Sequence, residues 1–326
     1  METNSGQLAP TRAAKLARDL LANVERALRG KSEIVLRATV ALVARGHLLL
    51  QDVPGVGKTT LARALARSVD GLFHRIQFTN DLLPGDLTGV SVPELENGRP
   101  THRFRFQPGP LFANVVLADE INRANPKSQS ALLEAMSEQT ISVDGHTHPL
   151  PDPFFVVATQ NPLEHCGTHE LPESQLDRFL MCLSIGYPDR EHEAEVLRED
   201  PATSALPQLE PVVQMPELRD MQRIAAQVKF DDSLVGYVLD IAAESRQHEC
   251  LEIGVSPRGA LNLRRAAQAR ALIDARDYCI PEDIRELAVD VLAHRISTVR
   301  RGGTRQGGEE AQWIVREILD RVPVPL

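Results

Sequence analysis

The feature that most constrains the fold is a glycine-rich segment between a strand-like run, Leu48–Gln51, and a helix-like stretch, Lys58–Ser68. The junction reads Asp52-Val53-Pro54-Gly55-Val56-Gly57-Lys58-Thr59-Thr60. It fits the phosphate-binding pattern GxxxxGK[ST], except that Asp52 replaces the first glycine. Glycines let backbone N–H groups point at phosphate oxygens, and the helix N-terminus adds positive potential. The alternative is a purely structural turn, but strand, glycines, lysine, threonine and helix follow in the order that a nucleotide site requires.

A second apolar run, residues 115–118, ends in the carboxylates Asp119 and Glu120. In a nucleotide site, Lys58 would reach the terminal phosphates, and Thr59 and Asp119 would hold Mg²⁺. Glu120 would be the base that polarises the attacking water. Neighbouring residues of a strand point to opposite sides, which suits two different roles. Acidic pairs are common at strand ends, so this pair gains its meaning only together with the glycine-rich loop.

Short apolar runs alternate with helical segments between residues 47 and 185, at residues 47–50, 73–78, 115–118, 154–159 and 181–185. This alternation is typical of a parallel sheet with helices on both faces. Asn97-Gly98 and Asp144-Gly145 each lie between strand-like stretches and predict two inserted β-hairpins. After Tyr187-Pro188 the strands stop, four prolines between residues 199 and 216 indicate a linker, and the remainder is helical. The chain therefore reads as an α/β domain followed by a smaller α-helical domain.

The composition limits the kind of partner and the cellular compartment to be expected. The chain has 36 basic and 45 acidic side chains, a net charge of −9 and a pI of about 5.6, which argues against nucleic acid as the main partner. Four widely spaced cysteines without a CxxC pair favour a reducing compartment. The first ten residues have no apolar signal core, and the most apolar stretch, residues 38–50, is too short and polar to span a bilayer. We therefore expect a cytoplasmic protein with no membrane span.

Longer motifs around these residues point to a family. The segment after the carboxylate pair continues as Ala118-Asp119-Glu120-Ile121-Asn122-Arg123-Ala124. Further motifs lie at residues 109–114, 129–136, 143–145, 158–162 and 171–179. Together they closely resemble the MoxR family of AAA+ ATPases, over about residues 30–295. The resemblance implies an AAA+ P-loop αβα domain with a five-stranded parallel sheet and a helical lid. The expected divisions are an N-terminal helical extension (1–30), the nucleotide-binding domain (31–188), a linker (189–216) and the lid (217–326).

The resemblance also assigns roles to three residues beyond the loop and the carboxylates. Asn161 matches the sensor that helps place the lytic water, the alternative being a plain turn residue before Pro162. Arg178, in Leu176-Asp177-Arg178-Phe179, matches the arginine finger that reaches a neighbouring subunit's γ-phosphate, the alternative being a surface ion pair. Arg258, in Ser256-Pro257-Arg258-Gly259, matches the lid arginine that senses nucleotide in its own subunit. The expected cofactors are ATP and Mg²⁺.

The resemblance implies a ring-forming ATPase, by family analogy a homo-hexamer, that remodels or assembles client protein complexes. Such proteins usually act with a separate partner that contains a von Willebrand factor A domain, often in metalloenzyme maturation. One alternative is a nucleic-acid motor, which Arg99, Arg103 and Arg105 on one predicted hairpin and Arg300-Arg301 leave open. The other is a nucleotide-switched scaffold with little turnover. His165, Cys166 and His169 superficially suggest a metal site, but their spacing fits no zinc template, which favours a solvated loop.

Overall fold

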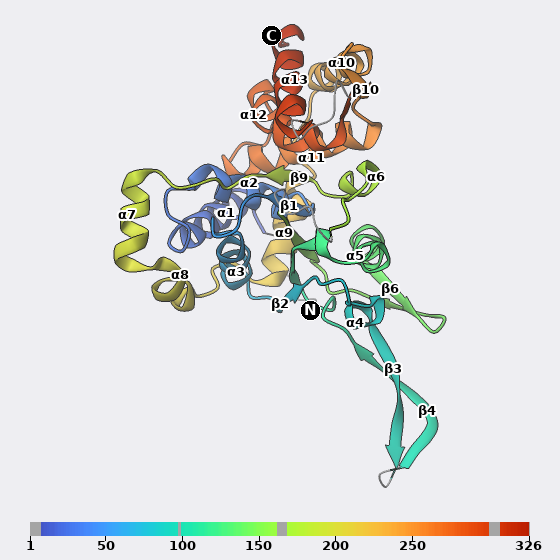
Figure 1. The fold of residues 1–326 in the computed structure, drawn as a ribbon. Helices are drawn as coiled ribbons and strands as arrows, with labels where there is room; N and C mark the ends of the chain where they lie inside the picture. Colours follow the sequence, from blue (N-terminus) through green and yellow to red (C-terminus); the bar gives the residue numbers. More distant parts are fainter. Residues whose placement is uncertain (1–7, 97–98, 162–167, 300–306, 326) are drawn as a thin grey trace, which may run out of the picture.

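A five-stranded parallel sheet lies at the centre of the molecule (Figure 1). The computed structural model describes residues 8–96, 99–161, 168–299 and 307–325. The strand order is β2-β5-β8-β1-β9, and every pairing is parallel. The strands are β1 (Leu48–Gln51), β2 (Phe73–Gln77), β5 (Val115–Asp119), β8 (Phe155–Gln160) and β9 (Met181–Leu183). The predicted sheet is therefore confirmed.

The sheet is covered on both faces, which explains why its strands are apolar without alternation. Successive residues of one strand enter different cores: Leu48 and Leu50 belong to one buried cluster and Leu49 to the other. The first cluster includes residues of α1 (Pro10–Glu25), α2 (Ser32–Val43) and α3 (Lys58–Ser68). The second includes residues of α5 (Pro126–Glu138). Helix α1, within the predicted N-terminal extension, thus contributes to the core beside the sheet.

Two antiparallel hairpins interrupt the α/β order. One joins β3 (Gly89–Glu96) to β4 (Arg99–Pro108) after α4 (Pro84–Thr88), and it projects far from the sheet (Figure 1). The other joins β6 (Thr140–Val143) to β7 (His146–Pro149). Its turn residues Asp144 and Gly145 have φ of 50° and 78°, as a primed turn requires. Both predicted hairpins are confirmed, although the Asn97-Gly98 turn lies outside the described residues.

The chain after residue 188 is mostly helical, and its part from residue 232 onward forms one end of the molecule (Figure 1). Residues 189–216, predicted to be a linker, carry α7 (Arg190–Glu199), α8 (Pro201–Ser204) and the 3-10 helix η2 (Leu206–Gln208). The helices that follow are α9 (Met215–Ala225), α10 (Asp232–Gln247), α11 (Pro257–Ile273), α12 (Pro281–Leu292) and α13 (Gly307–Arg321). A short ribbon of β10 (Leu251–Ile253) and β11 (Ser297–Thr298) and the 3-10 helix η3 (Ala293–Arg295) connect them.

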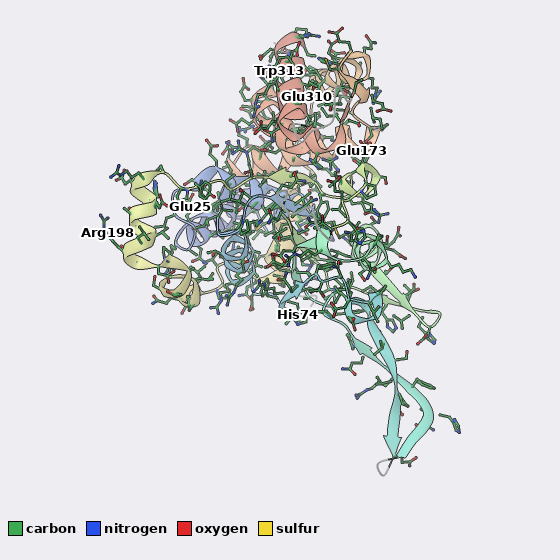
Figure 2. All side chains as sticks on the ribbon, in the orientation of Figure 1. Glu25, His74, Glu173, Arg198, Glu310 and Trp313 are labelled. Atoms are coloured by element: carbon green, nitrogen blue, oxygen red, sulfur yellow. The ribbon has the colours of Figure 1, made fainter. Side chains whose placement is uncertain are left out.

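The outer surface of the helical part carries polar and aromatic side chains, among them Glu310 and Trp313 (Figure 2). Trp313 is 58% exposed. Among the helices that the structure describes, none combines the length and the hydropathy needed to cross a bilayer.

Candidate nucleotide site

Three strands end side by side at one edge of the sheet. Gln51 of β1 pairs with Gln160 of β8, and Ala118 of β5 pairs with Ala158 of β8. The carboxyl ends of β1, β5 and β8 therefore coincide, and such an edge is where ligands bind in open α/β sheets. The structure brings together the glycine-rich loop, the two carboxylates and Asn161, as the sequence predicts.

The glycine-rich loop after β1 needs its glycines for backbone geometry. Gly55 and Gly57 have φ of 87° and 101°, a region that side chains with a Cβ rarely adopt. A Cβ on Gly57 would also lie 2.9 Å from Leu28 Cδ1. Helix α3 begins directly afterwards at Lys58, so its unpaired N–H groups border the loop. The Lys58 ammonium donates to the backbone oxygen of Asp52 at 2.5 Å, which places it over its own loop.

Asp52, the departure from the glycine pattern, anchors the loop to the strand beside it. Its Oδ2 accepts hydrogen bonds from Ser184 Oγ at 2.9 Å and from Gly186 N–H at 2.7 Å, and its Oδ1 accepts from Val53 N–H at 2.8 Å. Burial alone would raise the pKa of Asp52, but these hydrogen bonds outweigh it and lower the pKa below its ordinary value. The sequence shows Asp52 only as a missing glycine, because Ser184 and Gly186, the two partners outside the loop, lie more than 130 residues away.

Replacing Asp52 with glycine restores the common pattern, yet we expect it to weaken the site. The change removes three hydrogen bonds to a charged acceptor and adds backbone freedom, so we expect a loss of roughly 1–3 kcal/mol in unfolding free energy. We also expect weaker ATP binding, measured by titration with a fluorescent ATP analogue. Asp52→Asn, which keeps the side-chain size and one acceptor, serves as the matched control with a smaller loss. Equal stability and affinity for Asp52→Gly and the parent would contradict the anchoring role.

Asp119 is the last residue of β5, and both of its carboxylate oxygens are engaged. Thr159 of β8 donates its hydroxyl to Oδ1 at 2.6 Å, and Arg75 of β2 donates to Oδ2 from Nη2 at 2.6 Å and from Nε at 3.2 Å. Asp119 is 8% exposed, so these contacts compensate a buried charge. Sequence reasoning missed Thr159 and Arg75 as positioning groups. Only the order of the strands shows that β2 and β8 flank β5.

The alternation of side chains along a strand predicted that Glu120 is part of the strand. Instead, Glu120 lies just beyond the end of β5. Its φ of 57° is in the left-handed region, which turns the chain sharply after Asp119. Its N–H donates to Thr159 Oγ1 at 2.9 Å, so one threonine fixes both acidic residues. The Glu120 Oε2 accepts from Gln77 Nε2 at 2.6 Å and lies 3.2 Å from Arg123 Nη1. The two carboxylates thus face different partners because of this turn.

Asn161 directly follows β8 and is 4% exposed. Its backbone oxygen accepts a hydrogen bond from Asn122 Nδ2 at 3.3 Å, which ties the end of β8 to the segment after Glu120. Of the loop that superficially suggested a metal site, His165 and Cys166 lie outside the described residues. Within the described part of the chain, no three histidine, cysteine or acidic side chains gather as a metal site.

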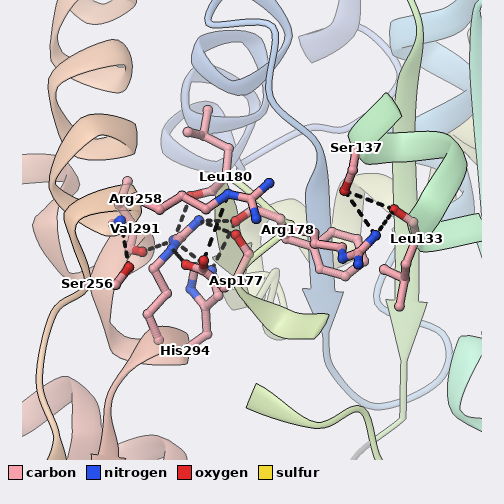
Figure 3. A network of polar contacts seen from close by, with 12 residues as sticks. Leu133, Ser137, Asp177, Arg178, Leu180, Ser256, Arg258, Val291 and His294 are labelled. Atoms are coloured by element: carbon pink, nitrogen blue, oxygen red, sulfur yellow. Dashed lines mark hydrogen bonds and ion pairs between the residues drawn. The ribbon is translucent and has the colours of Figure 1, made fainter. Parts of the chain in front are cut away.

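Arg178 and Arg258 belong to a network between the sheet domain and the helical end (Figure 3). Arg178 donates from Nη1 to the backbone oxygen of Leu133 and, at 3.0 Å, to Ser137 Oγ, both on α5. Arg258, at the start of α11, places its Nε 3.8 Å from Asp177 Oδ2. Asp177 also accepts from Arg295 Nε at 2.8 Å. Burial lowers the pKa of Arg295 to about 10 against the opposing effect of Asp177, so its guanidinium stays charged at neutral pH.

Comparison with known proteins first defines the class. Residues 47–181 match the model of the ATPase family associated with various cellular activities (AAA), and residues 243–318 match the AAA lid domain. A crystal structure of a presumed ATPase from Cytophaga hutchinsonii superimposes with a TM-score of 0.86 at 35% identity and covers 97% of both chains. The fold is therefore an AAA+ nucleotide-binding domain with a helical lid, and the protein is an ATPase.

Similar proteins then identify the family within this class. Protein YeaC of Bacillus subtilis is 49% identical over 304 residues, or 93% of both chains. Chaperone MoxR1 of Mycobacterium tuberculosis is 43% identical over 84% of this chain and 73% of its own length. Protein MoxR of Methylorubrum extorquens is 32% identical over 94% of this chain and 96% of its own. The chain belongs to the MoxR family of AAA+ ATPases.

Proposed function

We propose that this ATPase hydrolyses ATP to remodel or activate client protein complexes, with the strand-edge residues as its catalytic centre. The observation that carries the proposal is the meeting of the glycine-rich loop, Asp119, Glu120 and Asn161 at one edge of the sheet. The loop N–H groups and Lys58 would bind the phosphates. Asn161 would help to place the attacking water, and Arg258 would respond to the nucleotide from the lid.

The donor set at this edge suits Mg²⁺, a hard cation that prefers oxygen ligands. Asp119 would hold it directly or through water, and the Thr59 hydroxyl would be a second ligand. The hydrogen bond from Thr159 and the ion pair with Arg75 already hold the Asp119 carboxylate in one orientation. Bound Mg²⁺ would neutralise charge on the phosphates. Placing the carboxylate correctly is the contribution of the chain itself.

Glu120 is the residue best placed to be the general base. It follows Asp119 directly, its backbone is fixed by Thr159, and its side chain is about one-third exposed, so water can reach it. Gln77 and Arg123 hold the carboxylate at the end of the sheet. A general base must lie within hydrogen-bond reach of the proton that it takes, so an effective one is held in position. These contacts supply that position.

In this proposal, the nucleotide site is complete only when a second subunit supplies an arginine. AAA+ ATPases commonly oligomerise, and Arg178 binds α5 of its own chain instead of the strand-edge carboxylates. We propose a homo-hexameric ring in which Arg178 completes the site of the neighbouring subunit. A guanidinium on the γ-phosphate would stabilise transition-state charge. The ring would work in the cytoplasm.

The proposed partner is a separate protein with a von Willebrand factor A domain that presents the client complex. The relative named chaperone MoxR1 supports a chaperone role. The test is capture from a lysate of the source organism by immobilised Glu120→Gln with ATP, with Lys58→Ala as the matched control. We expect mass spectrometry to find a protein with such a domain enriched on the ATP-bound trap. Enrichment of no such protein on either variant would count against the proposed partnership.

A further inference from the structure

Arg295 joins the lid to the loop that carries Arg178. Among the residues that the structure describes, it is the one buried arginine or lysine, and its side chain is 1% exposed. It ends η3, directly after α12. Burying a cation is costly unless it is paired and hydrogen-bonded. What compensates the Arg295 charge therefore identifies what this side chain holds in place.

The hydrogen-bond partners of Arg295 outside the lid bracket the proposed arginine finger. Its Nε donates to Asp177 Oδ1 at 2.8 Å, and its Nη2 donates to the backbone oxygens of Phe179 and, at 3.4 Å, Asp177. Its Nη1 donates to the backbone oxygen of Leu180 at 3.2 Å. Within the lid, Nη1 also donates to the backbone oxygen of Val291 in α12 and lies 2.8 Å from His294 Nε2. A guanidinium is planar with its donors in a fixed fork, so one group sets the orientation of all these acceptors. The chain is thus fixed on both sides of Arg178, whose side chain extends the other way toward Leu133 and Ser137 (Figure 3).

The lid arginine that would sense nucleotide meets the same carboxylate. Arg258 Nε lies 3.8 Å from Asp177 Oδ2, opposite the oxygen that Arg295 binds. Arg258 is the second residue of α11, where the helix dipole disfavours a cation. The next residue, Gly259, leaves room for Arg295, because a Cβ there would lie 3.2 Å from Arg295 Cδ. The start of α11 and Arg295 therefore pack together against residues 177–180, the segment that contains Arg178.

We propose that Arg295 is a positioning residue that ties the finger Arg178 to the lid of its own subunit. Through Asp177 and the carbonyl groups of residues 177, 179 and 180, the lid sets the geometry of the finger offered to the next subunit. When Arg258 turns toward bound nucleotide, it leaves Asp177. Arg295 and the residues it binds, 177, 179 and 180, then move with the lid. The nucleotide state of one subunit thereby controls catalysis in its neighbour. This inference rests on the proposed role of Arg178 as a finger in trans.

The test is Arg295→Gln, which removes the fork and the charge. A displacement of about 1 Å at a catalytic group can cost on the order of 10²-fold in rate, so we expect kcat to fall roughly 10–100-fold. The KM for ATP should stay within about twofold, because the subunit's own phosphate site is untouched. Mixing with Lys58→Ala subunits should then restore turnover. In randomly mixed rings, about one quarter of the sites pair an intact phosphate loop with an intact finger across a heterologous interface.

Asp177→Asn is the second variant if Arg295→Gln does not fold. It keeps the size of the side chain and the carbonyl acceptors, and we expect the same rescue with a smaller loss. Arg276→Gln is the matched control, because Arg276 pairs with the buried Asp283 inside the lid. We expect it to lower the Tm while leaving kcat within about twofold.

The outcomes separate this inference from the proposed function. The reference pair is Arg178→Ala mixed with Lys58→Ala. If that pair recovers turnover and the Arg295→Gln pair does not, Arg295 does not act through the finger, although the shared site stands. If neither pair recovers, the shared site is absent and the inference falls with it. Recovery in both pairs supports the lid-to-finger coupling.

Discussion

Glu120→Gln is expected to reduce the kcat for ATP hydrolysis by roughly 10²–10⁴-fold, the usual contribution of a positioned general base. ATP binding should persist within about twofold, because the phosphate loop and Asp119 are unchanged. Glutamine has the same shape as glutamate and can still contact Gln77 and Arg123, but it cannot take a proton from water. The measurements are steady-state phosphate release and titration with a fluorescent ATP analogue.

The control for this experiment is Glu310→Gln, an equal change on the exposed outer surface of the lid (Figure 2). It should leave both turnover and binding as they are. A Glu120→Gln protein that turns over ATP at the parental rate would remove Glu120 from the mechanism. Loss of binding together with turnover would instead show that Glu120 is needed for the structure of the site.

Arg178→Ala is expected to cost up to ~10³–10⁵-fold in kcat, the range of arginine fingers. Within its own chain the Arg178 guanidinium donates to a carbonyl and a hydroxyl group of α5, both away from the glycine-rich loop, so its loss should leave nucleotide affinity unchanged. Equimolar mixing with Lys58→Ala should recover turnover, because each variant supplies what the other lacks. The measurement is phosphate release by each variant alone and by the mixture at constant total protein.

Two observations would contradict the shared site. One is a mixture whose rate equals the sum of the two separate variants, provided that light scattering shows mixed assemblies. The other is a strong loss of ATP binding by Arg178→Ala alone, which would place Arg178 in its own subunit's site. Arg276→Gln, which alters an ion pair within the lid, controls for nonspecific effects of removing an arginine.

Much of the fold could be predicted because it follows from local patterns. Apolar runs buried on both faces indicated a parallel sheet, and Asp144-Gly145 indicated a primed turn that the positive φ values confirm. The helices within residues 189–216 were harder to predict, because the prolines of this segment suggested an irregular chain. Yet Pro201, at the first turn of α8, is compatible with a helix. The domain divisions and the roles of the site residues remain predictions.

By itself, the sequence determined the chemical groups of the site and their order along the chain. Gly55 and Gly57, the lysine that follows them and the acidic pair after residue 118 are readable because each role depends on residues next to one another. Only the tertiary structure decided which distant side chains hold these site residues in position. Asp52 reaches Ser184 and Gly186, Thr159 reaches Asp119, and Arg295 clamps the loop around Arg178. These contacts span 40 to 134 residues, and they arise from strand order and lid packing, which no local pattern encodes.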